Sequence, residues 1–150
     1  MKKPVLFDSN FYVSHLMHNR LMSLLQKLKP FRIISCKQQM SEIERVLFYK
    51  HVAARAIKAY GTQLAYENEI EKALPVLTVQ CFLFDEGMVE IVLKEPKADP
   101  DDWYLTNLAY KHNAILVTDN TSDFITWRNS AQTMPIEILT VAEFFKQYGN

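Results

Sequence analysis

Three groups of acidic residues lie directly after or before short apolar segments of the sequence. These groups are Asp8, the run Asp99, Asp101 and Asp102, and the pair Asp119 and Asp123. Ligands of parallel α/β sheets bind at the carboxyl ends of the strands, so acids that follow neighbouring strands can converge there. Mg²⁺ takes one or two carboxylates together with waters and substrate phosphate. The spacing therefore predicts a candidate site for a hard divalent cation.

The acids around residue 100 have an alternative role in capping a helix. Asp99 is a favourable N-cap, Pro100 suits the first helical position, and Asp101 and Asp102 suit the positive end of the helix dipole. Capping accounts for Asp99 in full, and it could account for one of the other two acids. One acid of this run stays available for a metal.

The remaining acids differ in how readily local structure explains them. Asp119 and Asp123 also fit a turn and the cap of a short helix, and Glu42 can pair with Arg45 on an exposed helix face. Asp8 is harder to explain in this way, because a carboxylate directly after an apolar strand is costly unless it is paired or lies in a cleft. Asp8 is therefore the strongest single candidate.

Short, apolar, β-branched segments alternate with helical patterns, which predicts an α/β domain with a mostly parallel sheet. We expect strands at 4–7, 31–34, 88–93, 114–117 and 136–139. We expect a first helix from Asp8 to a stop at 29–30 and a second from 35 to 47, which a capping box of Ser35 and Gln38 opens. Further helices are expected over 51–73, with a weak point at Gly61, and over 99–112. The last helix follows a capping box of Thr140 and Glu143. Residues 74–86 fit either a strand or a helix.

The composition sets limits on the class of protein. A chain of 150 residues suits one domain and needs no disulfide or structural metal to fold. Its three glycines are far apart, which argues against a P-loop and a dinucleotide fingerprint. Cys36 and Cys81 form no zinc-binding pair and are expected to be reduced. No apolar run fits a signal peptide or a membrane span, so we expect a soluble, cytoplasmic protein with no membrane partner.

The net charge of zero is a cancellation between two halves of the chain. Residues 1–60 hold 11 basic and 3 acidic side chains, whereas residues 61–150 hold 6 basic and 14 acidic ones. Such asymmetry can mark a nucleic-acid surface. Arg45, Lys50 and Arg55 are candidates to contact an RNA backbone, and a solvated helix face explains each of them equally well. Neutrality therefore does not exclude RNA as a partner.

Four segments, in chain order, resemble the motifs of the PIN-domain family, and most closely those of PIN-family toxins. The segments are 5–14 (VLFDSNFYVS), 35–47, 99–109 and 116–124 (LVTDNTSDF). The first is similar to the family's opening strand, in which Asp, Thr and Asn follow hydrophobic residues. The others are similar to its second-helix motif, its third acidic motif and its final Thr-x-Asp/Asn segment.

Matching the chain to these motifs identifies its acids and shows two departures. Glu42 matches the acid of the helix motif, and Asp102 matches the metal-binding Asp of the third motif. Ser9 stands where Thr is usual and keeps the hydroxyl. Asn120 occupies the usual place of the fourth acid, so either Asp119 or Asp123 would have to replace it.

The resemblance implies a three-layer sandwich with a central, mostly parallel sheet of four to five strands flanked by helices. Residues 1–150 would form this single nuclease domain. The implied activity is that of a Mg²⁺- or Mn²⁺-dependent ribonuclease that hydrolyses RNA phosphodiesters, as the toxin of a toxin–antitoxin pair. The implied partners are an RNA substrate, a small antitoxin protein and a second copy of the chain in a homodimer.

The resemblance also implies a role for particular side chains. The implied catalytic acids are Asp8, Glu42, Asp102 and Asp119. The implied metal ligands are Asp8, Asp102, Asp119 and Asp123. The residues that would orient these ligands are Ser9, Asn10, Thr118, Asn120 and Asp101.

Two other functions fit the same residues. A HAD-like phosphatase also places an Asp after its first strand, but it needs a second Asp two residues later, where this chain has Asn10. A degenerate domain of the same fold would bind RNA or a protein without cleaving anything. His15 and His18, three residues apart, could ligate a metal, although surface or half-buried positions are more common for such histidines.

Overall fold

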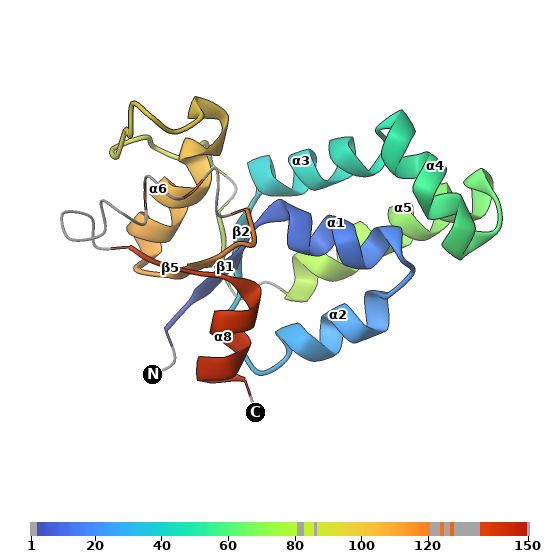
Figure 1. Cartoon of the computed structure of the whole chain (residues 1–150), viewed down its shortest axis with the longest axis horizontal. Helices are drawn as coiled ribbons and strands as arrows, with labels where there is room; N and C mark the ends of the chain where they lie inside the picture. The colour runs from blue at the N-terminus through green and yellow to red at the C-terminus, as the bar shows by residue number, and fades with distance from the viewer. Residues whose placement is uncertain are drawn as a thin grey trace.

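A computed structural model describes residues 3–80, 87–120, 124, 127 and 136–149, and the backbone of 83–85. Helices and short strands alternate along the chain (Figure 1), as the sequence predicts for an α/β fold. The strands are β1 (Val5–Phe7), β2 (Ile34–Cys36), β3 (Leu83–Asp85), β4 (Ile115–Val117) and β5 (Glu137–Leu139). The helices are α1 (Ser9–Met17), α2 (Leu21–Leu28), α3 (Lys37–Leu47), α4 (Lys50–Tyr60), α5 (Gln63–Gln80), the 3₁₀ turn η1 (Pro100–Asp102), α6 (Trp103–His112) and α8 (Val141–Tyr148).

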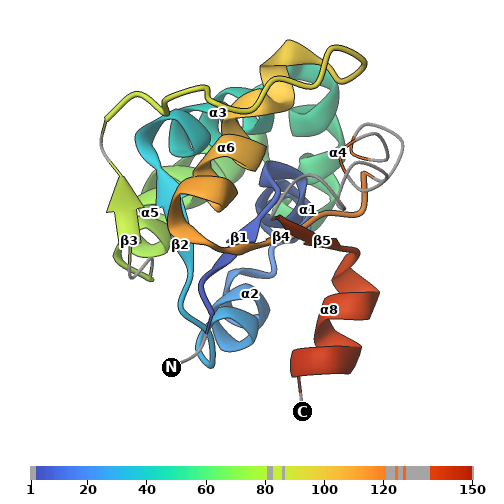
Figure 2. The same cartoon turned by 90° about the vertical axis from the view of Figure 1, so that its left-hand side faces the viewer.

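The strand pairs that the structure describes are all parallel. A three-stranded sheet has the order β1-β4-β5, and a two-stranded sheet joins β2 to β3. A single bridge between Val5 and Ile33 places β2 beside β1, so the strands follow one another as β3, β2, β1, β4 and β5 (Figure 2). Because the strands run the same way, the residues that follow β1 and β4 lie at one edge of the sheet.

Both faces of the sheet are covered by apolar side chains. Val5 and Phe7 of β1 belong to one buried cluster, which they share with α1 to α5 and α8. Leu6 between them belongs to a second cluster, which includes Leu105 and Leu108 of α6. This alternation follows the two-residue period of a strand. The strands are therefore buried between α6 on one side and most of the other helices on the other (Figure 1).

The predicted single helix from Asp8 to a stop at 29–30 is wrong, because the chain forms two helices there. α1 ends at Met17 and α2 begins at Leu21. Between them Asn19 has a positive φ of 57°, a conformation that Asn tolerates better than most residues. The apolar spacing continues across this turn because both helices face the same core, so periodicity alone could not reveal the break.

Two further predictions need correction. The second strand is Ile34–Cys36 rather than 31–34, and α3 is capped by Cys36, whose Sγ accepts from the Gln39 N–H at 3.4 Å, and not by Ser35. Residues 88–93 form no strand, although all of them except Glu90 are apolar and three are β-branched. The backbone N–H groups of Val92 and Leu93 instead donate to Oδ1 of Asn107, at 2.8 and 2.7 Å. A side chain of α6 takes the place of a neighbouring strand.

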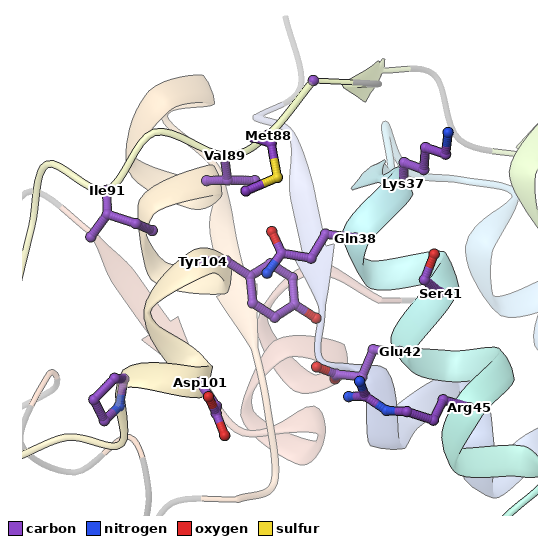
Figure 3. Close-up of a pocket in the computed structure, with 12 residues that line it drawn as sticks. Lys37, Gln38, Ser41, Glu42, Arg45, Met88, Val89, Ile91, Asp101 and Tyr104 are labelled. Atoms are coloured by element: carbon purple, nitrogen blue, oxygen red, sulfur yellow. The ribbon is translucent and has the colours of Figure 1, made fainter.

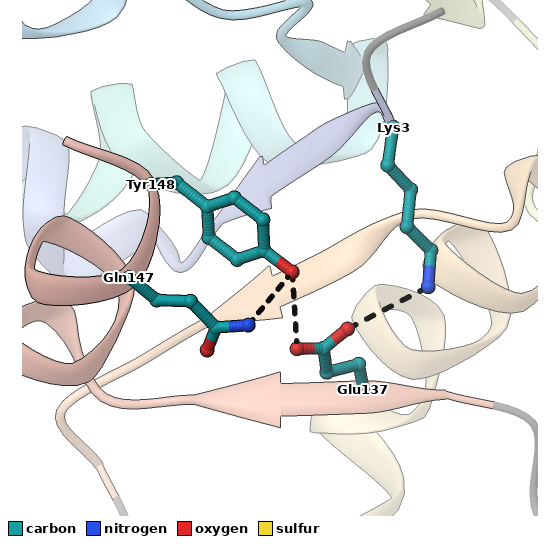
Figure 4. A network of polar contacts seen from close by, with 4 residues as sticks. All are labelled: Lys3, Glu137, Gln147 and Tyr148. Carbon is teal, nitrogen blue, oxygen red and sulfur yellow. Dashed lines mark hydrogen bonds and ion pairs between the residues drawn. The ribbon is translucent and has the colours of Figure 1, made fainter.

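Several local predictions are confirmed. The helical stretch after residue 50 breaks at Gly61, where φ is 87°. Of the region 74–86, which fits either a helix or a strand by its sequence, residues 74–80 continue α5 and residues 83–85 form β3. Asp99 caps η1 through the Asp101 N–H, and Thr140 and Glu143 form the predicted capping box. α8 is further tied to β5 by Tyr148, whose hydroxyl donates to Glu137, and Glu137 pairs with Lys3 at 3.7 Å (Figure 4).

No helix in the described part of the chain has both the length and the apolar character needed to cross a bilayer.

Candidate functional site

Asp8 lies at the junction of β1 and α1 and is held by both neighbouring elements. The residue is only 7 % exposed. Its Oδ1 accepts the Asn10 N–H at 3.2 Å, which caps α1, and its Oδ2 accepts the Thr118 hydroxyl at 2.6 Å. Thr118 directly follows β4, the neighbour of β1 in the sheet. The strand order thus brings together two residues that are 110 positions apart in the sequence.

The charge of Asp8 is held in an unfavourable environment. Burial raises the pKa of the Asp8 carboxyl above its usual 3.8, and the hydrogen bonds from Thr118 and Asn10 oppose this rise. The negative charges of Glu42 and Asp119 raise the pKa further. A bound cation would offset the free-energy cost of burying the Asp8 charge and would reduce the repulsion among the carboxylates.

Asp8 opens into a cavity of about 450 Å³, which we call the Asp8 pocket. Its lining comes from the residues that follow β1 and β4 and from nearby helices: Asp8, Asn10, Phe11, Ser14, His15, Lys27, Thr118, Asp119, Asn120 and Val141. Asp119 is oriented by the Val141 N–H, which donates to its Oδ1 at 2.9 Å. Asn120 donates its backbone N–H to the Thr118 hydroxyl at 3.0 Å. Five of the residues predicted for the site therefore share this pocket.

Glu42 lies in a different and larger cavity of about 780 Å³, the Glu42 pocket. Its lining comes from α3, from the segment after β3 and from the start of α6 (Figure 3): Lys37, Gln38, Ser41, Glu42, Arg45, Gly87, Met88, Val89, Ile91, Pro100, Asp101 and Tyr104. Glu42 and Arg45 come from successive turns of α3, and Asp101 comes from the opposite wall (Figure 3). The Glu42 pocket is therefore lined by both acidic and basic side chains.

A buried glutamine fixes the helix that carries Glu42. Gln39, one turn before Glu42, is fully buried. Its Nε2 donates to the carbonyl oxygen of Phe7 at 2.6 Å, and its Oε1 accepts the Ser35 hydroxyl at 2.6 Å. α3 is therefore anchored to the end of β1 and to the middle of β2. Gln39 is not among the residues that the sequence predicts for the site, because a helical glutamine is usually exposed.

Tyr104 connects the two sides of the site. It is 3 % exposed, and its hydroxyl oxygen is 3.4 Å from Oγ of Ser9, the residue after Asp8. The same hydroxyl points toward Glu42 (Figure 3), and burial together with the Glu42 charge raises the pKa of Tyr104 strongly. The phenol thus spans from the residue beside Asp8 to Glu42. No signal in the sequence singles it out, because a tyrosine in a helix usually serves core packing.

The other predicted acids are placed differently. Asp102 ends η1 and precedes α6, and it lines neither of the two pockets. Asp101 is exposed and lines the Glu42 pocket. Asp123 lies outside the described residues. Within the described ranges, no group of three or more His, Cys, Asp or Glu side chains is arranged to hold a metal ion.

The donor set of the Asp8 pocket nevertheless suits a hard cation. Asp8 and Asp119 are carboxylates of one pocket, and each has only some of its lone pairs engaged by hydrogen bonds. Mg²⁺ needs one or two carboxylates and completes its octahedron with water and substrate oxygens. Asp8 and Asp119 could therefore hold Mg²⁺ or Mn²⁺ without a third acidic side chain.

The predicted RNA-binding cations lie partly at the site. Arg45 lines the Glu42 pocket, whereas Lys50 and Arg55 are exposed on α4 and line neither cavity. Lys27 lines the Asp8 pocket, and Lys37 lines the Glu42 pocket. Lys27 belongs to a second group of basic residues that the sequence offers for an RNA backbone, with Arg20, Lys29 and Arg32. Lys37 is not among the predicted cations, because nothing in its local sequence indicates a cavity.

Comparison with known proteins adds no family assignment: no protein-family model matches the chain, and no curated protein matches it.

Proposed function

We propose that this protein is a metal-dependent ribonuclease with a PIN-like fold. The observation that carries the proposal is the buried Asp8, which follows β1 and shares one pocket with Asp119, which follows the adjacent β4. A buried carboxylate with a raised pKa and an acidic neighbour is typical of functional sites. The parallel sheet with both faces covered supports the three-layer PIN-like arrangement.

In the proposed reaction, Asp8 and Asp119 hold Mg²⁺ or Mn²⁺ beside an RNA phosphodiester. The cation would supply a bound water of lowered pKa and neutralise charge that develops on the phosphate. Thr118 keeps Asp8 in one orientation by donating its hydroxyl proton, and the Asn10 N–H fixes the other carboxylate oxygen. The Val141 N–H does the same for Asp119.

Glu42, Asp102 and Asp123 keep a proposed role as further acids of the site. The Glu42 charge acts on Asp8, and the hydroxyl of Tyr104, which reaches Ser9, points toward Glu42. In this position Glu42 can orient water or a ribose hydroxyl of a strand that runs through both pockets. Lys37 and Arg45 would then attract the phosphates that lie over the Glu42 pocket.

The resemblance to PIN-family toxins supports a biological setting for this activity. We propose that the protein is the toxin of a toxin–antitoxin pair, that it forms a homodimer and that a small antitoxin covers the site. Co-purification of a small protein encoded beside it, and its release together with the appearance of ribonuclease activity, would test this assignment.

The activity is tested by cleavage of single-stranded RNA in Mg²⁺ or Mn²⁺, with and without EDTA. We expect cleavage by the wild type that EDTA abolishes and that Asp8→Asn abolishes. Asp99→Asn is the matched control, because Asp99 caps η1 outside both pockets and Asn caps a helix equally well. An Asp8→Asn protein that cleaves as fast as the wild type would refute the proposal.

A non-catalytic RNA-binding domain is the second candidate, and one observation favours it. The described acids of the predicted site are not gathered in one cluster, because Asp8 and Asp119 line one pocket, Glu42 and Asp101 line the other, and Asp102 lines neither. Such a protein would bind single-stranded RNA and leave it intact in Mn²⁺. Wild-type cleavage that depends on Asp8 would exclude this candidate.

A further inference from the structure

The Asp8 pocket contains a basic pair that the proposed reaction leaves without a role. His15 of α1 and Lys27 of α2 both line this pocket together with Asp8 and Asp119. Nζ of Lys27 is 2.9 Å from Nε2 of His15, and Nδ1 of His15 is 2.7 Å from the carbonyl oxygen of Phe11. Two helices that the chain separates by a tight turn thus place an ammonium group in the pocket.

The hydrogen bonds define which atoms carry the protons. A carbonyl oxygen only accepts, so Nδ1 of His15 must carry the proton that it donates to Phe11. Nε2 is then free to accept from the Lys27 ammonium, which can only donate. The imidazole packs edge-on against the Phe11 ring, with centroids 4.6 Å apart, which fixes its orientation. His15 therefore acts as a neutral, rigid acceptor that positions Lys27.

The surroundings keep His15 neutral and leave the charge of Lys27 uncompensated. Burial lowers the pKa of His15, and the positive charges of Lys27, Arg20 and His18 lower it further, against the hydrogen bond to Phe11. The ion pairs found in the described part of the chain join Lys3 to Glu137 and Lys72 to Glu69, so no described carboxylate pairs with Lys27. One of the three ammonium protons goes to His15, and two remain for a ligand.

We infer that Lys27, positioned by His15, binds a phosphate of the RNA strand in the Asp8 pocket. This inference rests on the proposed function and names the residue that would hold the substrate in that pocket. A phosphodiester carries one negative charge, so it fits between a cation held by Asp8 and Asp119 and the ammonium of Lys27. The lysine would serve as a point charge with two free donors, which suits a phosphate that approaches from several directions.

Salt dependence of RNA binding tests this interaction directly. The parent is Asp8→Asn, which keeps the bound RNA intact, and the probe is a fluorescently labelled single-stranded RNA followed by anisotropy over a series of KCl concentrations. For single strands the slope of log K against log salt changes by about 0.7 for each phosphate that the protein neutralises. We expect Lys27→Met to reduce the magnitude of the slope by about 0.7 and Lys27→Arg to retain it.

Lys29→Met is the matched control. Lys29 lies two residues after Lys27 and directly follows α2. It is exposed and lines neither pocket, yet its replacement removes the same charge as that of Lys27. His15→Phe tests the positioning role, because it keeps the packing against Phe11 and removes the acceptor for Lys27. We expect weaker binding with an unchanged slope, since the charge remains and only its orientation changes.

Cleavage kinetics separate this inference from the proposed function. In proteins with Asp8 intact, we expect Lys27→Met to raise KM about tenfold, because one charge-assisted hydrogen bond to the substrate is removed, with a smaller effect on kcat. If the wild type cleaves RNA and Asp8→Asn does not, but Lys27→Met changes neither KM nor the salt slope, the proposed function stands and the inference on Lys27 is overturned. An equal change of slope in Lys29→Met would also overturn it, because binding would then belong to a diffuse basic surface. A wild type that neither binds nor cleaves RNA would refute both.

Discussion

The Asp8 pocket and the Glu42 pocket differ in how their acidic side chains are positioned. Asp8 and Asp119 follow two adjacent parallel strands, so the sheet itself sets the distance between them. Glu42 is carried by a helix, and its place depends on the buried Gln39 and on the phenol of Tyr104. The first pocket is built by backbone pairing, and the second by side-chain packing between elements distant in the sequence.

This difference explains what each pocket can tolerate. The hydrogen bonds that hold Asp8 and Asp119 come mainly from backbone N–H groups and from Thr118 at the sheet edge. Those of the Glu42 pocket come from side chains, which a single substitution removes. We therefore expect the chemistry of the Asp8 pocket to be sensitive to the acids themselves, and the Glu42 pocket to be sensitive to its supporting residues as well.

The largest expected effect separates the two acids. Asp8→Asn should lower kcat for RNA cleavage by about 10³-fold, because several kcal/mol of charge stabilisation by the cation disappear. Glu42→Gln should lower it only about tenfold if the Glu42 pocket assists from outside the metal site. Initial rates at saturating Mn²⁺ measure both. Equal reductions would contradict the separation and show that the two pockets form one centre when RNA is bound.

The Asp8 half of this site was predictable from sequence because its signals are local. An acid directly after an apolar strand, followed by a helix, needs only neighbouring residues to be recognised, and the same holds for the Asp99 cap and the capping box of Thr140 and Glu143. The parallel α/β class follows from the alternation of elements and is confirmed.

The Glu42 half was less predictable because its determinants are long-range. Gln39 bonds to Phe7, 32 residues away, and Tyr104 meets Ser9 across 95 residues. Segment 88–93 likewise fits a strand by its residue types, but two of its backbone N–H groups donate to the Asn107 side chain instead of to a neighbouring strand. No spacing rule within one segment reports such interactions, and Asp123 lies outside the described residues.

The next prediction concerns the residue that connects the two pockets. Tyr104→Phe keeps the buried ring and removes the hydroxyl that meets Ser9 and Glu42. We expect it to destabilise the fold by about 1 kcal/mol, as the removal of a buried hydrogen bond does. Urea denaturation measures this difference. Tyr110→Phe, which alters a more exposed tyrosine of the same helix, is the control and should change stability little.

A smaller effect distinguishes a functional carboxylate from a structural one. In EDTA, Asp8→Asn should raise the stability of the fold by on the order of 1 kcal/mol, because it removes a buried charge and its repulsion by Glu42 and Asp119. Asn keeps an oxygen that can accept the Asn10 N–H. Thermal unfolding should show a raised Tm for Asp8→Asn but not for Asp99→Asn.

Adding Mn²⁺ should reverse this order. A ligand that binds only the folded state stabilises it, so the Tm of the wild type should rise with Mn²⁺ while that of Asp8→Asn stays constant. A wild type that is already more stable than Asp8→Asn in EDTA would contradict the idea that the Asp8 pocket stores electrostatic strain for a cation.

The smallest expected effect concerns His15, the residue that distinguishes the Asp8 pocket by its basic pair. Its pKa in the folded protein lies below the usual 6.5, mainly through burial, with Lys27, Arg20 and His18 adding to the fall and the hydrogen bond to Phe11 opposing it. The unfolded chain therefore binds more protons at this position between the lowered pKa and 6.5. The contribution of neutral His15 to stability is present above pH 6.5 and is lost as the pH falls through the folded-state pKa.

His15→Phe should accordingly flatten the acid side of the stability profile, and the difference should be small because a half-exposed histidine is partly screened by solvent. Tm values of wild type and variant, taken from pH 8 to pH 5, should draw together as the pH falls if the wild type is the more stable at pH 8. A constant gap over that range would mean that His15 titrates alike in both states. The ring would then be an ordinary surface imidazole, and Lys27 would lose the neutral acceptor that sets the Asp8 pocket apart from the Glu42 pocket.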